Sequence, residues 1–514
     1  MIDTGVRAPA QHLAMRIAGA IIATVASGVC YGLCFPTASL HALAWVALVP
    51  WLAALRRVGA GEALGLAWLW TITAAYTLGD WFAGSVSRYY DQPSAVGAAF
   101  FVGVSSLMAA PYYMLFATWY RATTRCASVV TPLGVGAAWV VAEVLRGRLI
   151  AGNPWALFGY CQMDVAPLIQ IADVTGIYGI GFVLVAVNAA IVEMLVASDR
   201  ARAGLAAAVG LAVLAFGYGT WCLSTSWIDP DARRVRVAMV QGNLDVGTQW
   251  REDLYGSNLD AYLGLTRTVL AAERPEIVFW PENALTFFLE GEPAYRRAIA
   301  HVLTPSNAEL VVGGPRIEEG NPPRYFNSIF LVAPDGSVRS VYDKQLLVPF
   351  GERFPFPGLG FLHRRFARLR EFTPGPTRPP LPTRAGPAGV TICSEAMFPE
   401  IAATRVREGA AYFVDPAHDT WLTPKFSAQQ FDIVRLRAVE QRRYLVRAST
   451  SGPSAIVDPH GRVTARTEFF TRAALSGTIA LSDHVTVYNR VGDLFALCCV
   501  VGASVVWVRF RRRR

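Results

Sequence analysis

Lysine is almost absent from this sequence. Only two of the 47 basic residues in the 514-residue chain are lysines, Lys344 and Lys425, so arginine carries nearly all of the positive charge. A lysine is therefore unusual wherever it occurs. Lys344 ends the strand-like stretch "VRSVYDK", and we interpret it as a position that arginine does not fit, because a guanidinium is broader than a compact ammonium.

Cysteine and histidine are too sparse for a disulfide framework or a metal site. Of the eight cysteines, Cys393 is the one between residues 233 and 485, so it has no partner in that region. The seven histidines show no ligand spacing, and we expect no metal and no other cofactor. Cys393 ends the apolar stretch "AGVTIC", where a thiol is either core filling or a nucleophile.

Charged residues are scarce in the long apolar runs of the first 222 positions. The chain is 53% hydrophobic, and the runs are about 20 residues long, which is enough to cross a bilayer. We prefer a retained first span to a cleaved signal peptide, because the next run follows almost at once. The predicted spans are 15–34, 38–55, 61–79, 95–119, 128–146, 168–196 and 203–222, with one more at 490–508.

Three parts of the chain follow from this pattern. We expect a helical membrane domain at 1–225, a soluble domain at 233–485, and a C-terminal helix with a basic tail at 488–514. Arginine accumulates in cytoplasmic loops, and most arginines near the predicted spans fall on one side of the membrane together with the tail "RFRRRR". Both termini are therefore expected in the cytoplasm and the soluble domain outside. The net charge of +9 is then a topology signal, and we expect no nucleic-acid partner.

Short apolar strands alternate with amphipathic helices between residues 233 and 485, which is typical of a layered α/β domain. Three of these strands end in polar groups that packing does not require. Glu282 follows "IVFWP", Lys344 follows "VRSVYD" and Cys393 follows "GVTI". Since sites in layered α/β folds gather where strands end, these three residues are the candidate catalytic group.

The stretches "WPEN", "YDKQLLVPFGE" and "ICSE" resemble the Glu, Lys and Cys motifs of the nitrilase superfamily in order and spacing. With seven predicted spans before that domain and one after it, the whole chain resembles the bacterial apolipoprotein N-acyltransferase family. The resemblance implies an αββα sandwich beside a membrane bundle of about eight spans. It also implies the bacterial inner membrane, with the catalytic domain on the periplasmic side.

The resemblance implies a two-step acyl transfer. A thiol with an ordinary pKa must lose its proton to attack an ester, and Glu282 can accept it. Lys344 can stabilise the thiolate and then the oxyanion, and Cys393 carries the acyl group as a thioester. By resemblance, the donor is a phospholipid, phosphatidylethanolamine, and the acceptor is the α-amino group of the diacylglyceryl-cysteine that begins a lipoprotein.

Supporting roles are expected for several neighbours of these residues. Glu352 resembles the second glutamate of the superfamily, although a plain loop carboxylate is the alternative. Glu395 either supports the Cys393 loop through backbone hydrogen bonds or caps the helix that begins near Phe398. Tyr325 and Asn327 are expected on the sheet wall, where they would contact substrate.

Apolar and basic residues outside this group are candidates for lipid contact. Phe350 and Phe354 lie in a Pro/Gly-rich loop that is either a lid at the lipid interface or a loop packed on its own domain. Trp250 resembles a substrate-contacting tryptophan of the family, or is a packed surface residue. Arg146 and Asn153 resemble a family stretch suited to a phosphate headgroup, although an ordinary interfacial cluster is the alternative.

Two other functions remain to be weighed. A membrane-anchored amidase or nitrilase acting on a soluble amide would use the same three residues, but an anchor needs only one span and no apolar lid. A transporter would carry paired charges inside its spans, and the predicted spans are nearly free of them, with Glu143 as the main exception.

Overall fold

The computed structural model describes residues 7–123, 129–150, 152–196, 200–244, 251–349, 351–354, 371–420 and 423–511. The chain divides into two compact units. Residues 1–221 and 493–514 form the helical unit, and residues 222–492 form the α/β unit.

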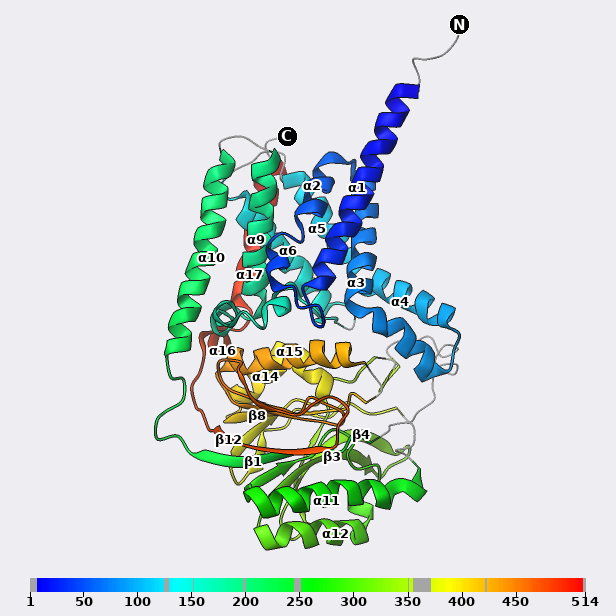
Figure 1. Ribbon diagram of the computed structural model, residues 1–514, viewed down its shortest axis with the longest axis vertical. Coiled ribbons are helices and arrows are strands. Elements are labelled where there is room, and N and C mark those ends of the chain that lie inside the picture. The colour runs from blue at the N-terminus through cyan, green and yellow to red at the C-terminus, as the bar shows by residue number, and fades with distance from the viewer. Residues whose placement is uncertain are drawn as a thin grey trace. The chain divides into compact units, whose positions relative to one another are not determined.

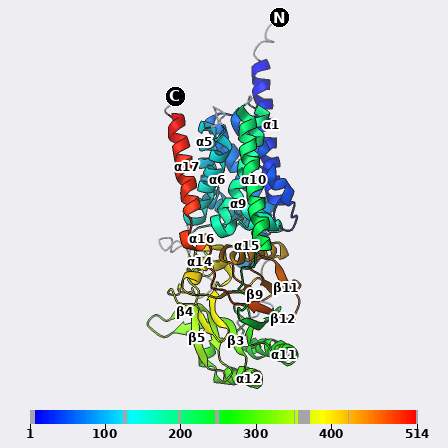
Figure 2. The ribbon, with the colours of Figure 1, turned by 90° about the vertical axis from the view of Figure 1, so that its left-hand side faces the viewer.

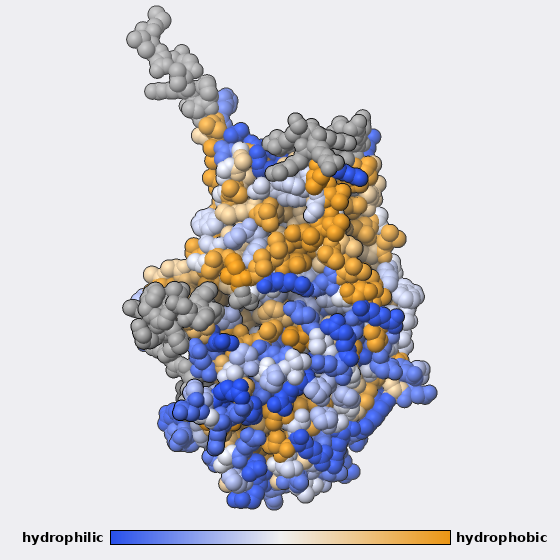
Figure 3. Space-filling view, turned by 180° about the vertical axis from the view of Figure 1, so that it is seen from behind, coloured by the Kyte–Doolittle hydropathy of each residue, from blue (hydrophilic) through white to orange (hydrophobic). Residues whose placement is uncertain are grey.

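The helical unit is a bundle in which α6 packs against both α9 and α17 (Figures 1 and 2). Orange, hydrophobic residues cover much of its surface in Figure 3. Its longer helices are α1 (Arg7–Leu33), α3 (Ala60–Tyr90), α4 (Ser94–Met108), α5 (Ala110–Thr123), α6 (Thr131–Arg148), α9 (Ile177–Val196), α10 (Arg200–Ser224) and α17 (Leu494–Arg511). The short ones are η1 (His41–Trp45), α2 (Val49–Arg57), η2 (Phe158–Gln162), α7 (Ala166–Ile169) and α8 (Ala172–Thr175).

The prediction of eight spans is only partly supported. Among the described residues, three helices are long and apolar enough to cross a membrane, namely His12–Leu33, Ile177–Val196 and Ala201–Ser224. A fourth is added if α4 and α5, which meet at a bend of 46°, form one broken span. Helix α6 is apolar for most of its length, but three charged residues, Glu143, Arg146 and Arg148, lie in its second half.

The predicted span at 38–55 does not form a single helix. It is divided into η1 and the nine-residue α2, which is about 14 Å long and too short to cross a hydrocarbon core of about 30 Å. The fully buried Asn188 of α9 accepts a hydrogen bond from the Leu48 N–H (2.9 Å) and donates one to the Ala44 carbonyl (2.8 Å). This amide satisfies the backbone between the two pieces, as irregular backbone inside a membrane protein requires.

The α/β unit contains two six-stranded sheets within the described residues. The first has the order β12-β1-β2-β3-β4-β5 and the second β11-β10-β9-β8-β7-β6. In the first sheet the strands are β1 (Arg234–Gln241), β2 (Ile277–Phe279), β3 (Glu309–Glu318), β4 (Arg324–Val332), β5 (Val338–Asp343) and β12 (Ala473–Ala480). In the second they are β6 (Leu381–Thr383), β7 (Gly386–Val390), β8 (Tyr412–Ala417), β9 (Leu445–Ser449), β10 (Ala455–Val457) and β11 (Val463–Arg466).

The two sheets pack face to face, which confirms the predicted αββα sandwich. Side chains of the first sheet, such as Val237 and Phe279, share a buried cluster with Val390 and Tyr412 of the second. Each outer face is covered by helices: α11 (Tyr255–Glu273) and α12 (Pro293–Leu303) lie on the first sheet, and α14 (Pro399–Arg407) and α15 (Pro424–Gln441) on the second (Figure 1). The remaining short helices are η4 (Glu252–Leu254), η5 (Leu289–Gly291), η6 (Thr304–Ser306), η7 (Cys393–Met397) and α16 (Val487–Val491).

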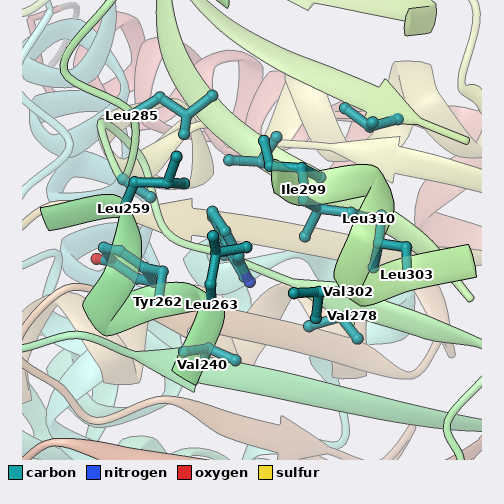
Figure 4. Close-up of a cluster of buried hydrophobic side chains, with 14 of the residues drawn as sticks. Val240, Leu259, Tyr262, Leu263, Val278, Leu285, Ile299, Val302, Leu303 and Leu310 are labelled. Carbon is teal, nitrogen blue, oxygen red and sulfur yellow. The ribbon is translucent and has the colours of Figure 1, made fainter. Parts of the chain in front are cut away.

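Helix α12 illustrates how an outer helix is fixed to its sheet by apolar packing. Its apolar residues Ile299, Val302 and Leu303 recur at helical spacing and are buried against the first sheet (Figure 4). Burying each such side chain contributes roughly 1.5–3 kcal/mol.

The strand directions bring Glu282 and Lys344 to one edge of the first sheet, whereas Cys393 follows β7 of the second sheet. Strand β2 is parallel to β3, and two successive antiparallel pairings, β3 with β4 and β4 with β5, make β5 parallel to β3. The carboxyl ends of β2 and β5 therefore lie at the same edge, as does the beginning of the antiparallel β4.

Candidate active site

Glu282 lies in the turn that follows β2 and is 3% exposed. The turn passes close to β3, where a Cβ atom on Gly313 would lie 2.4 Å from the Pro281 carbonyl oxygen. Glycine is therefore required at position 313 for the carboxylate to reach its place. Glu282 Oε1 accepts hydrogen bonds from Lys344 Nζ (3.1 Å) and Asn327 Nδ2 (2.7 Å).

Lys344 directly follows β5 and is 1% exposed. Its backbone N–H donates to the Asn327 carbonyl (2.8 Å), which continues the pairing of β5 with β4. Its ammonium donates to Glu282 and, at 2.9 Å, to Glu352 Oε1. The lysine therefore bridges two carboxylates in a buried site.

Asn327 and Glu352 complete this cluster. The Asn327 Nδ2 group donates to Glu352 Oε1 (2.8 Å) as well as to Glu282, so the amide and the ammonium lie between the same two carboxylates. The other oxygen of Glu352 accepts from the Val348 N–H (2.8 Å). Glu352 is thus hydrogen-bonded to side chains of the candidate site, and its role there stays a prediction. We expected Asn327 on the sheet wall as a contact to substrate and did not foresee its hydrogen bonds to both glutamates.

The electrostatics favour a resting ion pair. Burial raises the pKa of Glu282, but the opposing effects of Lys344, His418 and the Asn327 hydrogen bond are together larger, and the net pKa is lowered. Burial lowers the pKa of Lys344, yet the attraction of Glu282 and Glu352 raises it well above its ordinary value. Both groups are therefore ionised at neutral pH.

Cys393 begins η7, just beyond the end of β7, with a φ of +50°. A residue with a side chain rarely adopts this conformation, and such strain often marks functional positions. Burial raises the pKa of the Cys393 thiol and Glu282 raises it further, whereas Lys344 and the His418 backbone N–H lower it; the net pKa is raised. The resting residue is therefore a neutral thiol, and a base is needed to activate it.

Glu395 joins the segments that carry the lysine and the cysteine. Its fully buried carboxylate accepts hydrogen bonds from the Gln345 N–H (2.6 Å), the Leu346 N–H (3.2 Å) and the Ile392 N–H (2.8 Å). It also accepts from the Tyr342 hydroxyl, at 3.0 and 2.9 Å to its two oxygens. These bonds fix the Cys393 loop against the residues after Lys344, in line with the first of the two roles considered from the sequence.

The candidates for lipid contact in the α/β unit are less fully described. The partly buried Tyr325 is in β4, and its carbonyl accepts from the Thr373 N–H (2.7 Å). The Phe354 N–H donates to Glu371 (3.1 Å). Phe350, Trp250 and most of the predicted lid lie outside the described residues. The lid therefore stays a prediction.

Arg146 and Asn153 belong to the helical unit. Arg146 is buried in α6, and its Nη1 donates to the Trp155 carbonyl (2.8 Å). The Asn153 N–H donates to the Arg146 carbonyl (2.8 Å), and its side-chain oxygen accepts from the Trp155 N–H (3.2 Å). Within the described part of the chain, Nε and Nη2 of Arg146 have no hydrogen-bond partner. Such free donors fit an anionic group.

Two residues near the cysteine, one in contact with it and one in contact with the first, were not identified from the sequence. Gln430 of α15 donates from Nε2 to Cys393 Sγ (3.2 Å), and Arg447 of β9 donates from Nη2 to Gln430 Oε1 (2.9 Å). Both lie inside regular elements and not at strand ends. One signal was available, because Arg447 interrupts the otherwise apolar strand "LVRAS". As for metals, the described residues contain no cluster of three or more histidine, cysteine or acidic side chains that could hold an ion.

Comparisons with known proteins cover both units. The family of apolipoprotein N-acyltransferase N-terminal domains matches residues 27–190, and the carbon-nitrogen hydrolase family matches residues 236–487. Together with the two facing sheets, the second match identifies the α/β unit as a nitrilase-like fold.

Whole-chain relatives carry one consistent name. The chain is 33% identical over 501 residues to the apolipoprotein N-acyltransferase of Geobacter metallireducens, with 95% of each chain covered. It is also 33% identical over 448 residues to the enzyme of that name from Methylococcus capsulatus, with 84% of each chain covered. Among solved structures, it is similar to the C. elegans NitFhit protein at 22% identity and a TM-score of 0.41, covering 52% of this chain and 65% of that one.

Proposed function

The chain belongs to the apolipoprotein N-acyltransferase family, and from this premise we propose that Cys393 carries the acyl group as a thioester, with Glu282 as base and Lys344 as oxyanion partner. The observation that carries the proposal is the buried ion pair of Glu282 and Lys344 (3.1 Å), whose charges both act on the Cys393 thiol. A neutral thiol beside an ionised carboxylate and a fixed cation is the arrangement that nucleophilic acyl transfer needs.

In the first half-reaction, Glu282 accepts the Cys393 proton while the sulfur attacks an ester carbonyl of the phospholipid. The oxyanion of the tetrahedral intermediate forms near Lys344, whose ammonium is held by Glu282 and Glu352. The C–O bond then breaks, and Glu282 returns its proton to the departing lysophospholipid oxygen. The enzyme is left with a thioester.

In the second half-reaction, the α-amino group of the lipoprotein's diacylglyceryl-cysteine attacks the thioester. Glu282 accepts the amine proton, the C–S bond breaks, and the proton passes to the Cys393 sulfur as the amide is released. Hydrolysis is the competing reaction, and exclusion of water from the site protects the intermediate.

Lipid substrates also account for the other candidate residues. Phosphatidylethanolamine is the proposed donor, and the free donors of the buried Arg146, with Asn153 beside it, suit its phosphate. Trp250, Tyr325, Phe350 and Phe354 are proposed to contact the acyl chains. The α/β unit is proposed to lie on the periplasmic side of the inner membrane, with both termini in the cytoplasm, because the arginine-rich loops and tail favour that orientation.

The acceptor separates this function from an amidase that uses the same residues. Acyl-enzyme formed from labelled phospholipid is given a diacylated lipopeptide with either a free or an acetylated α-amine. We expect the label to pass to the free amine and to remain on the enzyme with the acetylated one. Release of labelled fatty acid at the same rate with both peptides would identify a hydrolase.

A further inference from the structure

The Cys393 sulfur has a polar neighbour on the side of α15. Gln430 is 1% exposed, and its Nε2 lies 3.2 Å from Cys393 Sγ. A glutamine at such a contact can present either its N–H or its carbonyl oxygen to the sulfur, and the two have opposite effects on a thiolate. An N–H stabilises the negative sulfur, whereas a carbonyl oxygen destabilises it.

The hydrogen bond from Arg447 fixes which atom of the Gln430 amide faces the sulfur. A guanidinium only donates hydrogen bonds, so the Gln430 atom 2.9 Å from Arg447 Nη2 must be the carbonyl oxygen. The amide nitrogen is then the atom that remains for Cys393. A buried glutamine between a fixed donor and the sulfur is thus held in the orientation that donates to the sulfur.

The arginine is itself fixed on its far side. Arg447 is fully buried in β9 and forms an ion pair with Asp415 of the neighbouring β8. Its Nη2 also lies 3.8 Å from Asp419 Oδ2. Asp419 accepts hydrogen bonds from the Ser449 hydroxyl (2.7 Å) and the Ser451 N–H (3.1 Å). Because a buried charge without partners is costly, this set of contacts leaves Arg447 little freedom to move.

We infer that Gln430 is a catalytic residue that donates an N–H to the Cys393 sulfur and stabilises it as a thiolate, with Arg447 as the positioning residue that fixes the amide. The inference rests on the proposed function of Cys393 and adds a group that acts on the sulfur itself. Two partners then act on the thiol, since Glu282 accepts the proton and the Gln430 N–H stabilises the negative charge that stays on the sulfur.

The same N–H serves both half-reactions. In the first, the S–H bond breaks, its proton goes to Glu282, and the electron pair stays on a sulfur that faces the Gln430 N–H. In the second, the C–S bond breaks and the electron pair returns to the sulfur at the same N–H. A hydrogen bond to a charged group corresponds to roughly ten- to hundredfold in an equilibrium or a rate.

Two variants at position 430 and one control separate this role from packing. Gln430→Glu keeps the size of the side chain and an acceptor for Arg447 but removes the donor. Gln430→Met removes both polar groups. The matched control is Gln441→Met, at the end of the same helix, where the buried amide accepts from Asn489 Nδ2 (2.7 Å) instead of contacting the cysteine.

The measurement is the pH profile of Cys393 alkylation by iodoacetamide in the full-length protein, followed on the Cys393 peptide by mass spectrometry. We expect the midpoint of the profile to move to higher pH in both Gln430 variants, with at least a tenfold lower rate at pH 8 and the larger loss in Gln430→Glu. The Gln441→Met profile should match the wild type. Thermal unfolding shows whether each variant folds. If Gln430→Met does not fold, the test relies on Gln430→Glu, which keeps the size of the side chain.

The outcomes distinguish this inference from the function beneath it. If the wild type forms thioester from phospholipid but both Gln430 variants keep its alkylation profile, the role of Gln430 is refuted and that of Cys393 stands. If Cys393→Ala still transfers acyl groups, the proposed chemistry fails whatever Gln430 does. A shift of equal size in Gln441→Met would show a general effect of lost packing and would also overturn the inference.

Discussion

Replacement of Lys344 by arginine tests whether the site needs an ammonium or only a positive charge. The Lys344 ammonium donates to Glu282 (3.1 Å) and Glu352 (2.9 Å) and is 1% exposed, so a replacement cation must fit between the same two carboxylates. A guanidinium is broad and planar and would pair with one carboxylate through two parallel hydrogen bonds. The carboxylates or the cation must then move by about 1 Å, and a displacement of that size costs about a hundredfold in rate.

The assay is thioester formation from labelled phospholipid in detergent, with thermal unfolding measured in parallel. We expect Lys344→Arg to lose about a hundredfold in rate and little stability, because a cation still lies between the carboxylates. Lys344→Met should lose activity and also roughly 3–5 kcal/mol of stability, because it leaves buried carboxylates without a counter-charge.

The second lysine of the chain provides the matched control. Lys425 lies in the first turn of α15, and Lys425→Arg should form thioester at the wild-type rate. A Lys344→Arg protein that also reached the wild-type rate would refute the argument that the site selects the shape of the cation.

Three further predictions concern other parts of the account. The pKa of Glu282 is lower in the folded state than its ordinary value of about 4.5. The ionised carboxylate therefore stabilises the fold above pH 4.5, and this stabilisation is lost as the pH falls through the folded-state pKa. Glu282→Gln should accordingly lose less thermal stability in acid than the wild type does. Asn327→Asp replaces the amide that donates to both Glu282 and Glu352 by a third carboxylate. It should lower the free energy of unfolding by about 2–3 kcal/mol and slow thioester formation more than Asn327→Ala does. Reporter fusions at residues 200 and 300 should give cytoplasmic and periplasmic signals respectively, and signals from one side only would contradict the proposed orientation.

Local signals in the sequence predicted a layered α/β domain and three candidate catalytic residues, and the resemblance to the nitrilase superfamily added the αββα sandwich. Strand and helix periods alternate along the α/β unit, and Glu282, Lys344 and Cys393 each follow an apolar strand. Strand direction then brings the two charged residues to one edge of the first sheet, with Lys344 Nζ 3.1 Å from Glu282.

Contacts between distant segments left little local signal in the sequence. The division of 38–55 depends on Asn188, which is about 140 residues further along the chain and satisfies the backbone there. Hydropathy alone identifies residues 38–55 as one apolar run and therefore predicts a single span. Likewise, Gln430 reaches the cysteine from the middle of a helix, and Arg447 reaches Gln430 from the middle of a strand. The packing of α15 on the second sheet brings them together.

The most direct test of the account is incubation of the purified full-length protein with acyl-labelled phospholipid in the absence of any acceptor. The account predicts one label per chain, on Cys393, that hydroxylamine releases and that Cys393→Ala does not acquire. Full label in Cys393→Ala, or acyl transfer by the wild type without any hydroxylamine-sensitive intermediate on Cys393, would contradict it.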